Sequence, residues 1–212
     1  MKIVFDGNIG CGKSKLISSI LTNKVINLPV CNEPLCDWEE WLKLFYSNMQ
    51  AHAFGFQMRV LKSHLDRKNI QQGLFERSPL SCQKVFGKLL FEDNMMSELE
   101  WNLTNEFNDD YGWLPDIVVY LKCTPEVCHK RIQNRNRNGE ESISLEYLSK
   151  VHQKYEELYS ENSIIGKKIK VITIDATQTL EQVYDSVMNQ LIKKIKNNNN
   201  RFVLNHDGFL IY

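Results

Sequence analysis

The sequence lacks a surplus of either charge. Lysine plus arginine number 26 and aspartate plus glutamate number 26, so the formal net charge is zero. A chain without a net positive field does not attract polyanions in general, and we expect no nucleic-acid partner. Its apolar runs fall far short of the roughly 20 residues needed to cross a bilayer, so no membrane partner is expected either. The opening MKIVFDG reaches Asp6 and Gly7 too early for a secretory signal, which predicts a reducing, cytoplasmic compartment.

The sequence also lacks the cysteine spacings of metal and redox sites. Its 6 cysteines include no C-x-x-C pair. The pairs Cys31/Cys36 and Cys123/Cys128 have a spacing typical of neither a zinc knuckle nor a redox motif. We therefore interpret the cysteines as free thiols that act as small buried apolar side chains.

Short apolar segments alternate with long helix-forming ones. The apolar segments are β-branched or aromatic and are bounded by turn residues, and they predict strands at residues 2–6, 27–32, 72–76, 116–122 and 169–174. The stretches between them are too long for hairpins and require crossover helices. The pattern therefore predicts an α/β fold, with a five-stranded parallel sheet flanked by helices on both faces. We expect one domain over residues 1–196 and a linker and tail of unknown role over residues 197–212.

A phosphate-binding loop follows the first predicted strand. Residues 7–14, GNIGCGKS, match G-x-x-x-x-G-K-[ST] and lead into an amphipathic helix predicted from Lys15 to about Leu21. Backbone N–H groups of such a loop surround phosphate oxygens, the lysine reaches the β- and γ-phosphates, and the serine hydroxyl is a ligand for Mg²⁺. The predicted ATP contacts are Gly7, Asn8, Ile9, Gly10, Cys11, Gly12, Lys13 and Ser14.

Three charged residues lie at the ends of two predicted strands beside this loop. Glu33 comes after the second predicted strand, and a carboxylate there can accept a proton from an attacking hydroxyl. A solvated acidic turn explains Glu33 equally well when it is considered alone. Glu76 and Arg77 end the third strand, where the carboxylate can hold Mg²⁺ and the guanidinium can neutralise a transferring phosphoryl group.

Basic residues are also concentrated after the fourth strand. Arg131, Arg135 and Arg137 lie near the end of a predicted helix, and we predict a mobile lid over a triphosphate at about residues 131–142. A solvated basic helix face explains the three arginines better when they are considered alone.

The order and spacing of several blocks resemble those of one family. The blocks are GNIGCGKS at 7–14, NEP at 32–34 with Trp38, Tyr46, the pair Phe56-Gln57, ERS at 76–78 with Phe86, and RIQNRNRNGEE at 131–141 followed by LEYL at 145–148. Over about residues 1–180 the chain resembles the deoxyribonucleoside kinases of the deoxycytidine, deoxyguanosine and mitochondrial thymidine kinase type, which include the insect multisubstrate enzyme. The resemblance implies a P-loop kinase that uses ATP and Mg²⁺, and a homodimer formed through helices after strands two and three.

The resemblance also implies roles for individual residues. Glu33 would be the base for the 5′-hydroxyl, Arg77 would contact the transferring phosphate, and Glu76 would join Ser14 at Mg²⁺. The remaining nucleoside contacts would be Trp38, Tyr46, Phe56, Gln57, Cys82, Phe86 and Glu140, with Gln57 on the base edge and with Tyr46 and Glu140 on the sugar 3′-hydroxyl. The remaining ATP contacts would be the three lid arginines and the loop near Asp175 to Leu180.

Two positions depart from the family pattern. Members that prefer deoxycytidine and purines carry an arginine and an aspartate where this chain has His64 and Cys82. A small neutral Cys82 leaves room near the base 5-position and resembles the branch that accepts thymidine. His64 either restricts this pocket or faces elsewhere.

The sequence therefore predicts transfer of the ATP γ-phosphoryl group to the 5′-hydroxyl of a deoxyribonucleoside, with pyrimidines preferred. A nucleoside monophosphate kinase of the thymidylate kinase type is one alternative, although Glu33 would repel an acceptor phosphate. A non-catalytic nucleotide-binding module is the other, and the presence of Glu33 and the lid arginines beside Lys13 argues against it.

Overall fold

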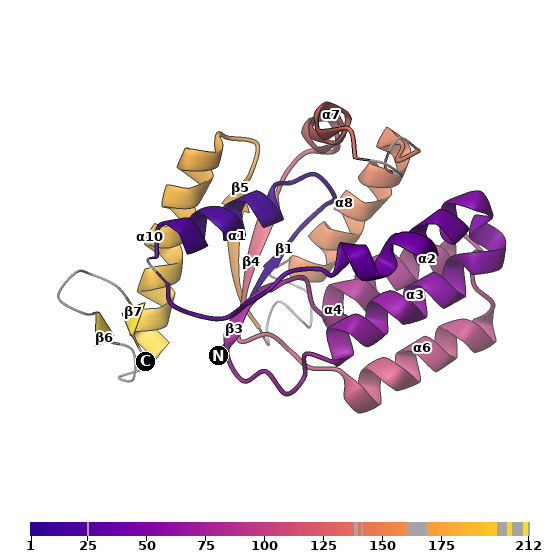
Figure 1. Ribbon diagram of the computed structural model, residues 1–212, viewed down its shortest axis with the longest axis horizontal. Coiled ribbons are helices and arrows are strands. Elements are labelled where there is room, and N and C mark those ends of the chain that lie inside the picture. The colour runs from indigo at the N-terminus through magenta and orange to yellow at the C-terminus, as the bar shows by residue number, and fades with distance from the viewer. Residues whose placement is uncertain are drawn as a thin grey trace.

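A five-stranded sheet forms the centre of the protein, seen here in a computed structural model (Figure 1). The structure describes residues 1–24, 26–137, 140, 142–160, 169–198, 203–204 and 210–211. All neighbouring strands of the sheet are parallel, in the order β2-β3-β1-β4-β5. Their bounds are β1 Lys2–Asp6, β2 Val30–Cys31, β3 Gly73–Glu76, β4 Ile117–Lys122 and β5 Lys170–Asp175. The predicted sheet is confirmed.

The second strand is much shorter than the predicted 27–32. β2 lies at the edge of the sheet and pairs only with β3, through Val30 with Leu74 and Cys31 with Phe75. Pro29 has no N–H to donate to a ladder, although its carbonyl accepts a hydrogen bond from the Leu74 N–H at 2.8 Å. Regular pairing therefore begins only after the proline.

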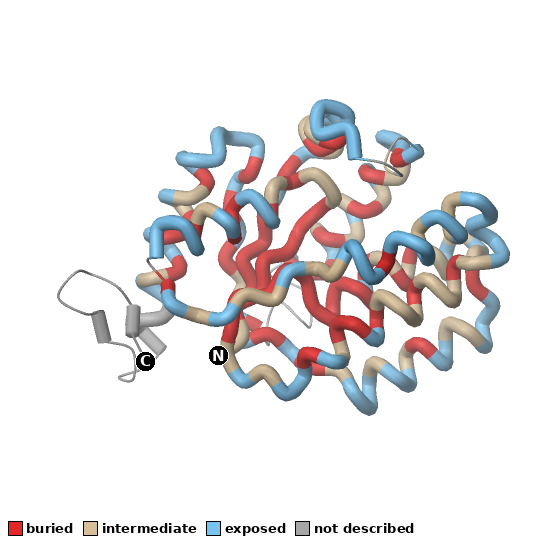
Figure 2. The backbone as a smooth tube through the Cα atoms, in the orientation of Figure 1, coloured by how far each residue is buried: buried red, intermediate tan, exposed pale blue. Residues whose placement is uncertain are grey.

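Helices cover both faces of the sheet, as predicted. Alternation along β1 sends Ile3 and Phe5 to one face and Val4 to the other. The first face packs against α1 (Lys13–Thr22) and α10 (Leu180–Asn198), and the second against α8 (Leu145–Tyr159). Figure 2 shows the strands as the most continuously buried part of the molecule.

A group of helices extends from the β2–β3 side of the sheet (Figure 1). It contains α2 (Leu35–Ser47), α3 (Met49–Leu65) and α6 (Glu98–Tyr111). Between β3 and α6 the chain forms α4 (Pro79–Ser81), the π-helix η1 (Cys82–Gly87) and α5 (Lys88–Glu92). After β4 comes α7 (Pro125–Arg135). Most of the predicted nucleoside contacts lie on α2, α3 and η1, far from the phosphate loop in sequence.

The structure describes only part of the predicted C-terminal tail. In the tail, β6 (Val203–Leu204) and β7 (Leu210–Ile211) pair antiparallel, and the other tail residues after 198 lie outside the described part. Within the described ranges no helix is long and apolar enough to cross a bilayer.

All of the cysteines are free, as predicted, but Cys36 is exposed on α2 and does not act as a buried apolar group.

Candidate active site

The loop between β1 and α1 has the backbone of a phosphate-binding loop. Gly7, Gly10 and Gly12 have φ angles of 138°, 81° and 109°, which L side chains rarely adopt. A Cβ on Gly7 would also lie 2.6 Å from the Leu121 carbonyl oxygen, so a larger residue there would have to displace β4. The α1 helix begins at Lys13, two residues before the predicted start, and its positive dipole end points into the loop.

The side chains at the end of this loop suit a triphosphate and a hard cation. Lys13 is buried, and its Nζ donates to the carbonyls of Gly7 at 3.1 Å and Asn8 at 2.9 Å. The Ser14 Oγ donates to Glu76 Oε1 at 2.7 Å, so a hydroxyl and a carboxylate oxygen are already adjacent. Both are oxygen ligands of the kind that Mg²⁺ takes, with phosphates and water completing its shell. The residues present therefore fit a magnesium ion.

Glu33 and Arg77 form a buried ion pair at the carboxyl ends of neighbouring strands. Arg77 NH1 lies 2.6 Å from Glu33 Oε2, and the two side chains are only 9% and 7% exposed. Arg77 has a φ of 55°, a left-handed conformation that costs a non-glycine residue about 1–3 kcal/mol. Such strain is retained where the surrounding contacts determine the conformation, as they do here.

The Arg77 guanidinium keeps its charge inside the protein. Burial acts to lower its pKa, but the carboxylate of Glu33, with further contributions from Tyr155 and Asp6, leaves the pKa well above the usual value. The guanidinium also lies over the ring of Phe86, 4.8 Å from its centroid. A fixed positive charge thus lies against the phosphate loop, where Arg77 NH2 approaches the Gly7 carbonyl at 3.4 Å.

Arg67, a residue that the sequence did not single out, holds the ends of β2 and β3 together. It is buried just after α3, and its guanidinium donates to the carbonyls of Asn32 at 2.7 Å, Cys31 at 3.4 Å and Glu76 at 3.5 Å. Burial lowers its pKa, against the opposing effect of nearby acidic groups. Arg67 therefore fixes the backbone from which Glu33 and Glu76 project.

Gln57 and Cys82, two of the predicted nucleoside contacts, are in contact with each other. The Gln57 Nε2 donates to the Cys82 carbonyl at 2.9 Å and approaches its Sγ at 3.5 Å. Burial, reinforced by Glu33, raises the pKa of the Cys82 thiol to about 12, so the thiol is neutral. Cys82 and Phe86 both lie in η1, and π-helical turns of this kind occur often at functional sites.

His64 lies beside Glu33 rather than elsewhere. Its Nε2 is 4.0 Å from Glu33 Oε1, and its ring meets that of Trp38 edge-on at 6.1 Å between centroids. Burial, and then the positive charges of Arg67 and Arg77, hold the pKa of His64 well below its ordinary value, so it is neutral and forms no ion pair. Neither ring nitrogen has a hydrogen-bond partner among the described residues.

Arg131 joins the phosphate loop to the loop after β5. Its guanidinium donates to the carbonyls of Cys11 at 3.2 Å, Ala176 at 2.8 Å and Gln178 at 3.2 Å. The exposed Asp175 carboxylate accepts from the Thr177 hydroxyl and N–H, and these bonds lower its pKa. The loop near Asp175 to Leu180, which is predicted to contact ATP, is therefore in contact with the first of the lid arginines.

The other two lid arginines contact Glu140. Arg135 binds its carboxylate through Nε and NH2, each at 2.6 Å, and Arg137 approaches it at 3.4 Å. The predicted sugar contacts of Tyr46 and Glu140 stay predictions, as does movement of the lid. Residues 138, 139 and 141 of the lid lie outside the described part.

Phe56, another predicted nucleoside contact, stacks on Phe45 with 5.1 Å between ring centroids.

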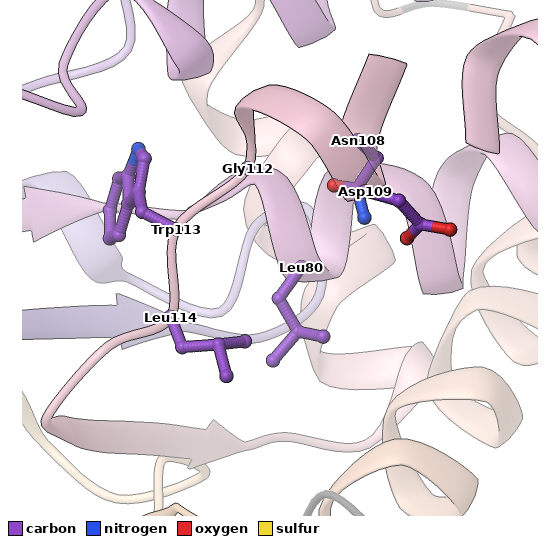
Figure 3. A pocket seen from close by; sticks show the side chains of 6 residues that line it. All are labelled: Leu80, Asn108, Asp109, Gly112, Trp113 and Leu114. Atoms are coloured by element: carbon purple, nitrogen blue, oxygen red, sulfur yellow. The ribbon is translucent and has the colours of Figure 1, made fainter. Parts of the chain in front are cut away.

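A surface pocket lies elsewhere on the molecule. It is formed by the end of α6, the segment before β4 and one residue of α4, and Figure 3 shows the side chains that line it. The lining residues are Leu80, Asn108, Asp109, Gly112, Trp113 and Leu114. None of them is a predicted nucleotide or nucleoside contact, so we assign the pocket no part in the chemistry.

The fold and this arrangement of loop, buried carboxylates and arginines define a P-loop kinase. The model of the deoxynucleoside kinase family matches residues 3–197, and the chain belongs to this family. It is 33% identical to a probable deoxycytidine kinase of fowlpox virus, covering 82% of this chain and 78% of the relative. It is 28% identical to human deoxycytidine kinase, covering 92% and 89%.

The solved structures agree with the sequence relatives. A structure of deoxyadenosine kinase from M. mycoides matches with a TM-score of 0.79 and 25% identity, covering 91% of this chain and 100% of that one. The chain is therefore an enzyme, a phosphotransferase that acts on deoxynucleosides with a nucleotide as phosphate donor.

Proposed function

We propose that the protein is a cytoplasmic salvage enzyme that transfers the ATP γ-phosphoryl group to the 5′-hydroxyl of pyrimidine deoxyribonucleosides, with Mg²⁺ as cofactor. The observation that carries the proposal is the buried Glu33–Arg77 pair, 2.6 Å apart at the strand ends beside the phosphate loop. The pair places a proton acceptor next to a fixed positive charge, which is what a hydroxyl needs when it attacks a phosphoryl group.

Each charged group has a separate part in this reaction. Glu33 accepts the proton of the 5′-hydroxyl, and N–H groups of Arg77 stabilise the charge on the transferring phosphoryl group. Lys13 and the loop backbone hold the donor phosphates, while Arg131, Arg135 and Arg137 close over them. Ser14 and Glu76 would hold Mg²⁺, which when bound neutralises charge on the donor phosphates.

The pyrimidine preference rests on Gln57 and Cys82. The Gln57 amide offers a donor and an acceptor, so it can pair with thymine or cytosine, and the neutral Cys82 leaves space for a thymine methyl. Burying one methyl group is worth about 1 kcal/mol, which favours thymidine at least equally with deoxycytidine. The relatives reported above are named deoxycytidine and deoxyadenosine kinases, so the preference for pyrimidines rests on the residues of this chain.

Phosphate transfer from ATP to each of the four deoxynucleosides and to thymidine monophosphate tests this function. We expect phosphorylation of thymidine and deoxycytidine, slower reaction of the purine nucleosides, and none of thymidine monophosphate. Transfer only to the monophosphate would indicate a thymidylate-type kinase. We do not expect this result, because Glu33 would repel the acceptor phosphate. Nucleotide binding without any transfer would indicate a binding module.

Substitution of Cys82 tests the substrate assignment. Cys82→Asp should shift the ratio of kcat/KM values toward deoxycytidine, because the new carboxylate can accept from the cytosine amino group but meets only a carbonyl in thymine. Cys82→Ser is the matched control, because it keeps the size and neutrality of the thiol and should leave the ratio close to that of the wild type. A wild-type preference for either purine nucleoside would contradict the pocket assignment and leave the kinase assignment in place.

We further propose a homodimer that forms through α6. Apolar side chains repeat every fourth residue along this helix and remain exposed, so they form one stripe. The stripe consists of Leu99 (83% exposed), Leu103 (40%), Phe107 (39%) and Tyr111 (53%). Exposed apolar stripes of this kind favour association with another surface, and a second copy of the chain supplies an identical one.

Sedimentation at several protein concentrations tests this assembly. We expect the wild type at twice the chain mass, and Leu99→Lys to shift it toward the monomer because the charge would have to be buried in the interface. The control is Leu21→Lys on α1, which is 42% exposed and lies outside the stripe. A monomeric wild type, or an equal effect of both substitutions, would contradict the proposal.

A further inference from the structure

Asp6 is a buried carboxylate that no step above uses. It ends β1 immediately before the phosphate loop and is fully buried. Its oxygens accept hydrogen bonds from the Gly7 N–H at 2.9 Å, the Tyr155 hydroxyl at 2.7 Å and the Tyr159 hydroxyl at 2.7 Å. Buried carboxylates are costly unless donors of this kind surround them, so the arrangement calls for an explanation.

Tyr155 connects this carboxylate to Arg77. A hydroxyl has one proton to donate, and Tyr155 gives it to Asp6, which leaves a lone pair to accept from the Arg77 Nε–H at 3.2 Å. Burial, and then the charge of Asp6, raises the pKa of Tyr155 well above its ordinary value, so the donor proton stays in place. The direction of both hydrogen bonds is therefore fixed.

The Arg77 guanidinium is held along its whole edge. Nε–H donates to Tyr155, NH1 donates to Glu33 at 2.6 Å, and NH2 approaches the Gly7 carbonyl at 3.4 Å. A guanidinium has more N–H groups than these contacts use, and its plane is rigid. Three fixed contacts therefore determine where the remaining N–H groups point.

We propose that Asp6 and Tyr155 are positioning residues for phosphoryl transfer, which act by fixing the plane of the Arg77 guanidinium beside Glu33. This inference rests on the proposed function of Arg77. Neither residue touches the reacting atoms. They hold the Arg77 guanidinium in the orientation that stabilises the transferring phosphoryl group in the transition state. Because this orientation is fixed before the substrates bind, no reorganisation is needed during the reaction.

The two tyrosines provide a matched pair of variants. Tyr155 and Tyr159 lie one helical turn apart on α8, both are buried, and each gives one hydroxyl proton to the same carboxylate. Of these two hydroxyls, only that of Tyr155 also accepts a hydrogen bond from Arg77 among the described residues. A purely structural role of the Asp6 cluster predicts similar losses for both, whereas a positioning role predicts a difference.

The experiment compares kcat, both KM values and Tm in Tyr155→Phe and Tyr159→Phe. We expect kcat to fall by about 10- to 100-fold in Tyr155→Phe, with the KM values for ATP and thymidine within about twofold of the wild type. Tyr159→Phe should keep nearly the wild-type kcat at a similar Tm. Equal kcat in the two variants, with normal transfer by the wild type, would overturn the positioning role alone. A wild type that phosphorylates no nucleoside would overturn the proposed function and this inference together.

A double-mutant cycle with Asp6→Asn gives a second readout. The amide keeps the shape of the carboxylate, and its oxygen can still accept from the Gly7 N–H and the Tyr155 hydroxyl, which share Oδ1 in the wild type. The negative charge is lost, however, and with it the charge-assisted hydrogen bond that holds the Tyr155 proton toward residue 6. If the two residues act through Arg77 as one unit, Asp6→Asn combined with Tyr155→Phe should lower kcat little further than Tyr155→Phe alone. Fully additive losses in kcat would contradict a shared action on Arg77.

Discussion

Glu33→Gln should lower kcat by about 10²- to 10⁴-fold, the usual loss when a general base is removed. The amide has the shape of the carboxylate, and its oxygen can still accept from Arg77 NH1, which lies 2.6 Å from Glu33 Oε2 in the wild type. The pocket should therefore keep its form, and thymidine should bind with nearly unchanged affinity. What is lost is the ability to take the proton of the 5′-hydroxyl.

Single-turnover rates and calorimetric binding of thymidine measure the two effects separately. Glu40→Gln is the control, because the Glu40 side chain lies on α2, the helix that follows Glu33, and is 84% exposed. It should behave as the wild type. A near-normal kcat in Glu33→Gln would remove Glu33 from the catalytic role and leave it as the partner of Arg77.

Lys13→Ala should abolish measurable transfer and weaken ATP binding far more than nucleoside binding. The Lys13 ammonium is buried at the end of the phosphate loop, where its Nζ bonds the carbonyls of Gly7 and Asn8. Its charge therefore acts on the donor phosphates and not on the nucleoside. Removing it also frees two loop carbonyls, which should loosen the loop itself.

Separate titrations with ATP and with thymidine check this result. Lys15→Ala is the matched control, since Lys15 is exposed two residues further along α1 and has no predicted contact with phosphate. Equal weakening of both ligands in Lys13→Ala would indicate misfolding or a wrong assignment of the loop.

Much of the fold could be predicted because it depends on local pattern. Strands such as Ile117–Lys122 are continuous apolar runs, and their spacing leaves only parallel pairing through helices. The phosphate loop needs particular residue types at fixed offsets, so the sequence predicted residues Gly7 to Ser14 as one motif. The length of the edge strand β2 was overestimated. Its sequence pattern does not reveal that the strand pairs on one side only and that this pairing begins after Pro29.

The supporting residues of the site could not be predicted in the same way. Asp6, Arg67 and Tyr155 owe their roles to contacts between elements that are distant in sequence. Arg67 is one of several basic residues around the end of α3, and only the fold brings it to the carbonyls of β2 and β3. Asp6 carried a weak signal, because an acidic residue that ends an otherwise apolar, buried strand must find donors.

His64 was only half predictable. The family pattern has an arginine at this position, so the sequence showed a departure but left open whether His64 restricts the base pocket or faces elsewhere. The fold buries it 4.0 Å from Glu33, and burial, followed by the positive charges of Arg67 and Arg77, lowers its pKa and keeps it neutral. Sequence alone contains neither the burial nor these neighbours, and both decide its charge.

The fate of a labelled γ-phosphate tests the central claim most directly. The purified protein is incubated with γ-labelled ATP, Mg²⁺ and thymidine, and the labelled product is identified by chromatography and mass. The proposed function predicts that the label appears as the 5′-monophosphate of thymidine, at a rate that falls by about 10²-fold or more in Glu33→Gln. Label that appears only as inorganic phosphate, or only on added thymidine monophosphate, would contradict it.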